Sequence, residues 1–340
     1  MKLKISKTTS LCKHLLLSFT LLSLAQSAYA AVTWNTINPH IQFLKQQDDL
    51  RFYDSNQVLI EGDKCALLVD TSANFAAVEQ LAKDLKKRLK TPLCYLVATH
   101  YHDDHLLGMA VMQSFYPDAK LIVHQQVNTN FSQYQKAYTD KLDTYEKSIE
   151  LSYQRLASVA KEEQDQWRSK LELAKSRLFR WQEYQLNEPQ ITINAPKKIN
   201  LGGFEITINP HQAHTNGDLT ISANNATVLI GGDIVDWLPY PGHGELKKWQ
   251  ILLEQYINDE NLSVIIPGHG GVLTKEQLKQ PLSFLTAITE HVKNNDGKTI
   301  EQLMQSFPES VIKPYKQEAL NIKSSNFFLQ AGLNRAKSSK

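Results

Sequence analysis

A cluster of potential metal ligands constrains the fold of this chain more than any other feature of its sequence. Three histidines, His100, His102 and His105, fall within six residues, and Asp104 lies among them. In an extended segment, residues two apart point to the same side, so the first two imidazoles face one way. Imidazoles held together without a cation would repel one another on protonation and leave polar atoms without partners. The cluster therefore predicts a metal site.

Three further ligand-type side chains occur later in the chain. His214, Asp233 and His269 each lie just after a short apolar run, among glycines that let the backbone approach closely. Sites in layered α/β folds form where loops leave the strands, so we expect these side chains to join the histidine cluster. Neutral imidazole and carboxylate are the ligands that suit zinc, iron or manganese.

Alternating strand-like and helix-like segments predict an α/β layered fold. No internal repeat or low-complexity linker divides the chain, so residues 31–340 are expected to form one domain with a helical tail over about 299–337. The predicted strands cover residues 58–61, 66–70, 93–98, 120–124, 191–193, 204–208, 219–222, 227–230 and 264–266. The predicted helices cover residues 75–89, 106–115, 246–256 and 274–293.

A long segment without glycine or proline interrupts this alternation between Pro117 and Pro189. Large apolar residues recur in it at helical spacing, which predicts a helical hairpin insertion over about 126–188 with its turn within 152–163. Two interpretations stay open. The hairpin is either a solvated helical pair with one packed stripe, or a lid or dimerisation arm that gives a homodimer.

The first 30 residues are typical of a secretory signal peptide. They hold four lysines and no acidic residue, then the mainly apolar run 15–24, and they end in Ala28-Tyr29-Ala30. The run is too short for the roughly 20 residues of a membrane span, so we expect cleavage after Ala30, a periplasmic or secreted protein and no stable membrane anchor. Without these residues the net charge is −2, which argues against a nucleic-acid partner.

Export gives a meaning to the two cysteines that remain after cleavage. Cys65 begins the strand-like run 65–70, and Cys94 lies in the strand-like run 93–98. If these strands are parallel neighbours, a disulfide between them would contribute about 3.5 kcal/mol to stability. Two buried free thiols are the alternative, since facing positions on parallel strands match disulfide geometry poorly.

The ordered motifs of the chain resemble those of the metallo-β-lactamase superfamily. The resemblance covers about residues 58–272 and implies a four-layer αββα sandwich with two metal ions at one edge of the sheets. It assigns one ion to His100, His102 and His214, the second ion to Asp104, His105 and His269, and a bridging position to Asp233. A bridging carboxylate resembles the glyoxalase II and lactonase branches, whereas the β-lactamases of the family often have Cys or Ser there.

This ligand set implies a hydrolase with two Zn²⁺ ions, with iron or manganese as possible replacements. A hydroxide shared by two such ions would attack a carbonyl-type bond in a small-molecule substrate: a β-lactam, lactone, ester or thioester. Asp104 and Asp233 are the expected catalytic residues, and Asp104 is also a plausible proton acceptor. The alternatives are an iron-dependent oxidoreductase of the same fold and a non-catalytic metal-binding protein.

Further residues are expected around the metal ligands. Asp70, Thr215 and Asp218 would orient the ligands by hydrogen bonds. The loop after Asp233 is rich in aromatic residues and would line the substrate pocket through Trp237, Tyr240 and His243.

Overall fold

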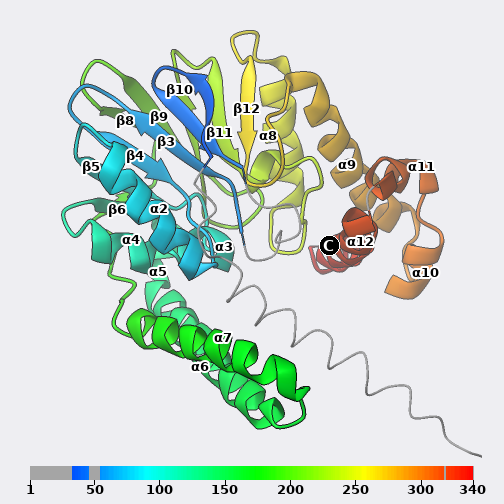
Figure 1. The fold of residues 1–340 in the computed structure, drawn as a ribbon. Helices are drawn as coiled ribbons and strands as arrows, with labels where there is room; N and C mark the ends of the chain where they lie inside the picture. The colour runs from blue at the N-terminus through cyan, green and yellow to red at the C-terminus, as the bar shows by residue number, and fades with distance from the viewer. Residues whose placement is uncertain (1–32, 46–53, 318, 340) are drawn as a thin grey trace, which may run out of the picture.

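Two β-sheets packed face to face form the centre of the molecule, and helices cover both outer faces (Figure 1). The computed structural model describes residues 33–45, 54–317 and 319–339. The predicted signal peptide, residues 1–30, with its cleavage site at Ala30, lies outside the described residues. No helix in the described ranges has the length and hydropathy of a membrane span. The layers confirm the predicted αββα sandwich.

The first sheet has seven strands in sequential order, and the second has five in the order β12-β11-β10-β9-β8. The first sheet contains β1 (Asn35–Asn38), β2 (Ile41–Leu44), β3 (Gln57–Glu61), β4 (Ala66–Val69), β5 (Leu93–Val97), β6 (Lys120–His124) and β7 (Ile191–Ile193). The second contains β8 (Lys197–Asn200), β9 (Glu205–His211), β10 (Asp218–Ala223), β11 (Val228–Gly232) and β12 (Val264–Pro267). Strands β4 to β7 pair in parallel, as do β11 and β12.

The alternation of side chains along the strands builds the layers. In β4, Leu67 and Val69 pack between the two sheets, whereas Ala66 and Leu68 face the helices on the outer side. Both sets are buried, because successive side chains of a strand point to opposite faces and each face of this sheet is covered.

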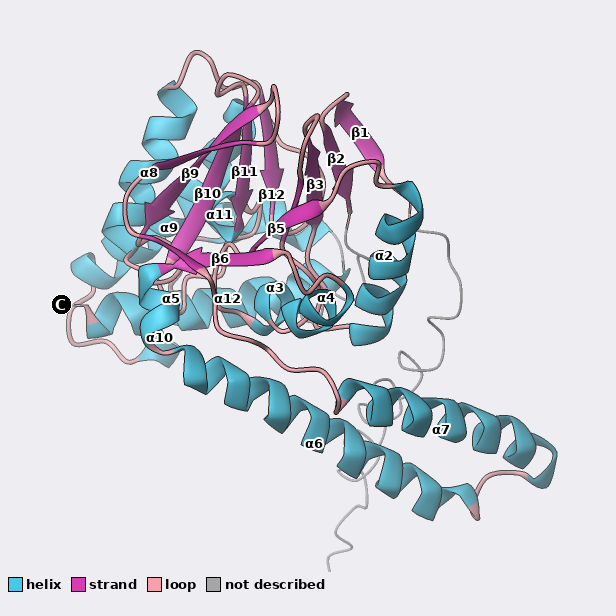
Figure 2. Ribbon diagram, turned by 90° about the vertical axis from the view of Figure 1, so that its left-hand side faces the viewer, coloured by secondary structure: helices cyan, strands magenta, loops and turns pink. Residues whose placement is uncertain are grey.

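Helices from separate parts of the chain cover the two outer faces (Figure 2). The first sheet is covered by α2 (Phe75–Arg88), α3 (Asp103–Leu106) and α4 (Met109–Phe115), and the short α5 (Gln125–Thr129) follows β6. The second sheet is covered by α8 (Leu246–Asn258) and α9 (Lys279–Asn294). The helical tail contains α10 (Ile300–Gln305), α11 (Glu309–Ile312) and α12 (Ala319–Ser338).

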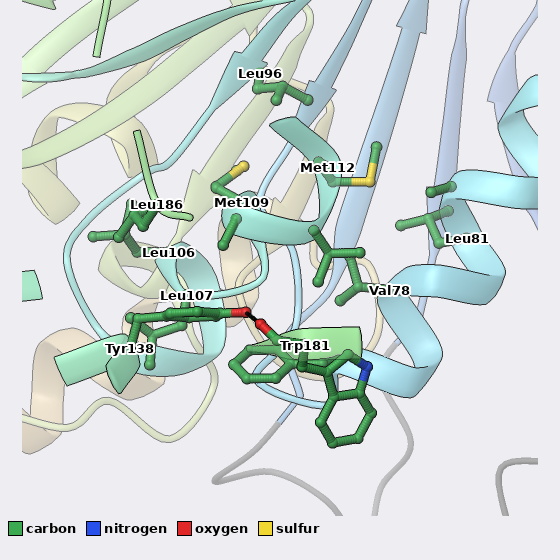
Figure 3. Close-up of a cluster of buried hydrophobic side chains, with 14 of the residues drawn as sticks. Val78, Leu81, Leu96, Leu106, Leu107, Met109, Met112, Tyr138, Trp181 and Leu186 are labelled. Carbon is green, nitrogen blue, oxygen red and sulfur yellow. Dashed lines mark hydrogen bonds between the residues drawn. The ribbon is translucent and has the colours of Figure 1, made fainter. Parts of the chain in front are cut away.

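The predicted insertion is an antiparallel pair of helices, α6 (Phe131–Leu156) and α7 (Lys161–Trp181), that extends away from the sandwich in both views (Figures 1 and 2). Its turn lies within the predicted range. The base of the pair packs on α2 and α4, where Tyr138 and Trp181 lie close to Val78 (Figure 3). The Tyr138 hydroxyl donates a hydrogen bond to the Trp181 carbonyl over 2.7 Å, which joins the two helices at this base.

Some predicted boundaries were wrong. The helix expected over 106–115 is split into α3 and α4, because the His105 carbonyl accepts hydrogen bonds from the Thr71 amide and hydroxyl instead of continuing the helix. The helix expected over 274–293 starts with a 3-10 turn, Lys275–Leu278. Strand β8 was not predicted, since it is an edge strand whose only buried side chain is Ile199.

The structure decides between the two interpretations of the cysteines. Strands β4 and β5 are parallel neighbours, and Cys65 and Cys94 form a disulfide with their Cα atoms 5.6 Å apart. Cys65 lies one residue before β4 begins, which frees its side chain from the regular strand pairing.

Candidate metal centre

The loops that leave β5, β9, β11 and β12 bring all of the predicted metal ligands together. Parallel strands β11 and β12 end side by side, so Asp233 and His269 meet at their carboxyl ends. The backbone at Gly268 passes very close to the Asp233 side chain. A Cβ atom on Gly268 would overlap the Asp233 carboxylate, so only glycine fits at this position.

The first ligand group contains three histidines around one point. His102 Nδ1 lies 3.0 Å from His100 Nε2 and 3.2 Å from His214 Nε2. Asp233 Oδ2 lies 3.8 Å from His100 Nε2 and 3.6 Å from His214 Nε2. All four ligand atoms lie within 4.8 Å of one another.

The second ligand group lies on the other side of the same aspartate. Asp104 Oδ2 is 3.0 Å from His269 Nε2 and 3.8 Å from His105 Nε2. Asp233 Oδ1 is 3.2 Å from His105 Nε2. The two oxygens of Asp233 therefore face different ligand groups.

The donor atoms fit divalent cations. His105 Nε2 and Asp233 Oδ1 are buried, and although they lie 3.2 Å apart neither makes a hydrogen bond, which would cost free energy without a cation. Three imidazole nitrogens of the first group point at one another, and imidazole and carboxylate are the donors that zinc, iron and manganese accept. His/Asp residues are thus positioned to bind divalent metal.

The electrostatics of the two groups differ. Burial lowers the pKa of His102 to about 4 and that of His214 to about 3, so both imidazoles are neutral at pH 7. Burial also acts to lower the pKa of His105 and His269, but Asp233 and the other nearby carboxylates outweigh it and raise both pKa values well above the usual one. The second group therefore has far more negative charge around it.

Asp70, expected to orient a ligand, contacts His105 directly. Its Oδ2 lies 2.9 Å from His105 Nδ1 and accepts a hydrogen bond from the Thr99 hydroxyl over 2.8 Å. Its Oδ1 accepts a hydrogen bond from the Thr99 amide over 2.7 Å. Its φ of 58° is unusual for a residue other than glycine, and such conformations occur at functional sites.

Thr215 and Asp218 contact the ligand loop and not the imidazoles. Asp218 accepts hydrogen bonds from the amide of Ala213 over 2.9 Å and from the hydroxyl of Thr215 over 2.6 Å. Burial raises the pKa of Asp218 to about 7 although these bonds oppose the shift. Because Ala213 and Thr215 flank His214, Asp218 fixes the backbone that carries this ligand.

Sequence analysis missed Asp236. Its Oδ1 accepts a hydrogen bond from the His269 amide over 2.9 Å, and its Oδ2 lies 2.9 Å from His269 Nδ1. Asp236 thus contacts His269 as Asp70 contacts His105. The spacing of two aspartates three residues apart, Asp233 and Asp236, in one turn of helix was the available signal.

A cavity of about 720 Å³ opens over the ligands. Tyr240 and His243 line it as predicted, and His243 Nδ1 lies 2.9 Å from His102 Nε2. The structure places Trp237 elsewhere: its ring packs against Tyr315, 6.1 Å between centroids, in the core beneath α9. The chain turns after Asp236, which directs this side chain away from the cavity.

Comparison with known proteins supports the same family. Residues 50–269 match the metallo-beta-lactamase superfamily. The chain belongs to this superfamily. The acyl-coenzyme A thioesterases MBLAC2 of Homo sapiens and of Bos taurus are each 24% identical to it, over 67% of this chain and 78% of theirs. With the ligand groups, this membership identifies a metal-dependent hydrolase.

Solved structures share the fold of this chain at low sequence identity. The sec-alkylsulfatase Pisa1 from Pseudomonas sp. superposes with a TM-score of 0.57 at 16% identity, covering 89% of this chain and 50% of that one. A metallo-beta-lactamase from Hirschia baltica gives 0.50 at 17% identity, covering 76% and 98%.

Proposed function

We propose that the protein is a dinuclear zinc hydrolase that cleaves a carbonyl-type bond: a β-lactam, lactone, ester or thioester. One observation carries the proposal. The two carboxylate oxygens of Asp233 face two separate ligand groups, each with a full set of imidazole and carboxylate donors. The thioesterase relatives support a carbonyl substrate, since their name specifies an acyl thioester.

Each ligand has a defined part in this proposal. His100, His102 and His214 would hold one cation, and Asp104, His105 and His269 would hold the other. Asp233 would contribute one oxygen to each group. A pair of bound cations supplies a nucleophile from water at neutral pH and polarises the bond under attack. Asp104 lines the cavity and accepts a proton there, while Asp70 and Asp236 keep their histidines in a fixed orientation.

Replacement of the shared aspartate tests the proposal. We predict that Asp233→Ala reduces metal content from two ions to about one per chain and lowers turnover by at least about 100-fold, because one oxygen of each group is lost. Elemental analysis of the purified protein and assays on cephalosporin, lactone and thioester chromogens measure both effects. Asp165→Asn, an exposed change on α7, is the control.

Unchanged metal content in Asp233→Ala would contradict the proposal that Asp233 is a ligand of both cations. The same elemental analysis of the unaltered protein tests the iron-dependent alternative, because this donor set also suits iron. Iron with no hydrolysis of any chromogen would favour an oxidoreductase.

We also propose that the protein is exported with cleavage after Ala30. The signal-peptide pattern of residues 1–30 supports this, and so does the disulfide between Cys65 and Cys94, because such bonds persist in oxidising compartments. Amino-terminal sequencing of the protein from a periplasmic fraction tests it. A mature chain that begins at Ala31 is expected, and a cytoplasmic protein with Met1 in place would overturn it.

A further inference from the structure

Two groups of aromatic side chains line the cavity above the metal ligands. In the first, Tyr101 and Tyr134 stack with ring centroids 5.4 Å apart. In the second, Tyr240 stacks on Phe327 at 6.0 Å and meets Phe328 edge-on at 5.0 Å. The cavity thus has largely aromatic walls, with Asn130, Gln133 and Asn216 among them, around a floor of imidazoles and carboxylates.

Three of these five aromatic residues come from the helical insertion and the helical tail. Tyr134 belongs to α6 of the helical insertion. Phe327 and Phe328 belong to α12 and lie beyond residue 269, where the family match ends. Tyr101 and Tyr240 instead lie in loops beside the metal ligands, so the walls combine these loops with helices α6 and α12.

Helix α12 is held firmly against the cavity. Arg335 donates hydrogen bonds to the Gly244 carbonyl over 2.6 Å and to the Glu245 carboxylate over 2.8 Å. Gly332 allows close approach to the same loop, since a Cβ atom there would lie 2.6 Å from Pro241 Cγ. These contacts fix α12 against the loop of Tyr240, so Phe327 and Phe328 are positioned before a ligand binds.

Phe327 differs from its neighbour Phe328 in its exposure to solvent. Its side chain is 54% exposed, whereas Phe328 beside it is 4% exposed. Covering an exposed aromatic ring with an apolar ligand removes apolar surface from water. Among the described residues that line the cavity, there is no lysine or arginine to pair with an anionic acyl group.

We propose that this cavity binds an apolar acyl chain, and that Phe327 and Tyr134 set the preference for long chains over short ones. The inference rests on the proposed hydrolase function and names its substrate class: esters or thioesters of apolar acids. In this reaction the acyl–oxygen or acyl–sulfur bond breaks. Water supplies the hydroxyl group of the acid product and the proton of the released alcohol or thiol.

A kinetic comparison of chain lengths tests the inference. The unaltered holoenzyme should hydrolyse 4-nitrophenyl octanoate with a kcat/KM at least about tenfold above that for 4-nitrophenyl acetate. Phe327→Ala should lower the ratio of kcat/KM for the octanoate to kcat/KM for the acetate about tenfold. Phe179→Ala on α7 is the matched control, because Phe179 is 68% exposed and does not line the cavity.

Binding without turnover separates this inference from the proposed function. Octanamide should displace the neutral fluorophore N-phenyl-1-naphthylamine from the unaltered protein, about tenfold more weakly in Phe327→Ala and in Tyr134→Leu. Circular dichroism of each variant should match that of the unaltered protein, which checks that the variants are folded. Displacement of the fluorophore without ester hydrolysis would support the acyl-binding site and contradict the proposed hydrolase function. Hydrolysis with no dependence on chain length, or equal displacement in Phe327→Ala and Phe179→Ala, would overturn the acyl site.

Discussion

At the scale of single residues, two aspartates hold the two histidines of the second ligand group by their Nδ1 atoms. Asp70 holds His105 and Asp236 holds His269, each over 2.9 Å. In the first group, His100 Nδ1 meets only the Thr99 hydroxyl at 3.1 Å. A carboxylate on Nδ1 fixes the ring and makes Nε2 a stronger donor to a cation.

We predict that Asp236→Asn weakens the binding of one metal ion by about 10- to 100-fold while the other ion stays in place. The asparagine keeps the size of the side chain but loses the negative charge beside His269. Metal content after dialysis against graded concentrations of a chelator measures the two affinities. Asp165→Asn serves again as the control, and equal affinities in both variants would contradict the role of Asp236.

At the scale of elements, an ion pair between the half-exposed Arg180 and a buried carboxylate on α2 connects the helical insertion to the sandwich. Glu79 on α2 is 5% exposed and accepts hydrogen bonds from Arg180 Nε over 2.9 Å and Nη2 over 2.8 Å, and from the Tyr184 hydroxyl over 2.9 Å. Burial alone would raise the pKa of Glu79, but the bonds from Arg180 and Tyr184 outweigh it and lower the pKa.

We predict that Arg180→Gln destabilises the protein by about 1–2 kcal/mol at pH 7, because it leaves a buried carboxylate without its cation. The pKa of Glu79 is lower in the folded state, so the stabilisation is present above the usual pKa of the group and is lost as the pH falls through the folded-state value. The difference between the two proteins should hold from pH 7 down to the usual pKa of a glutamate and shrink as the pH falls below it.

Urea unfolding of both proteins between pH 3 and pH 8 measures this difference. Effects on the metal ligands cancel, because both proteins have the same ligands. A difference that persists unchanged at pH 3 would show that Arg180 acts by packing alone. The homodimer expected through this insertion stays a prediction, which sedimentation of the same two proteins addresses.

At the scale of the whole molecule, the features that depend on local sequence patterns could be predicted from the sequence. The ligands His100, His214 and His269 follow apolar strands, and strand ends meet at one edge of a sandwich, so their grouping was predictable. The contact of Asp236 with His269 was harder to predict, because the two residues are 33 positions apart and only the pairing of β11 with β12 brings them together. The position of Phe327 in the cavity wall could not be predicted either, since its contact with Tyr240 depends on how the helical tail folds back onto the sandwich.

The disulfide shows the same division between local pattern and overall packing. The strands that carry Cys65 and Cys94 could be predicted, but whether the sulfur atoms meet depends on the register of β4 and β5. The structure places the bond across 29 residues that include all of α2. It therefore links the amino ends of two neighbouring strands, whose carboxyl ends lead into Asp70 and His100.

We predict that Cys65→Ala/Cys94→Ala lowers the free energy of unfolding by about 3.5 kcal/mol, because closing a loop of this length restricts the unfolded chain. Urea unfolding measures the loss. A phosphine reductant should lower the stability of the unaltered protein to that of the variant, and should not change the variant. A protein without residues 1–30, made in a reducing cytoplasm, should contain two free thiols and match the variant until it is oxidised. Equal stability of the oxidised protein and the variant would mean that strain in the folded state cancels the restriction of the unfolded chain.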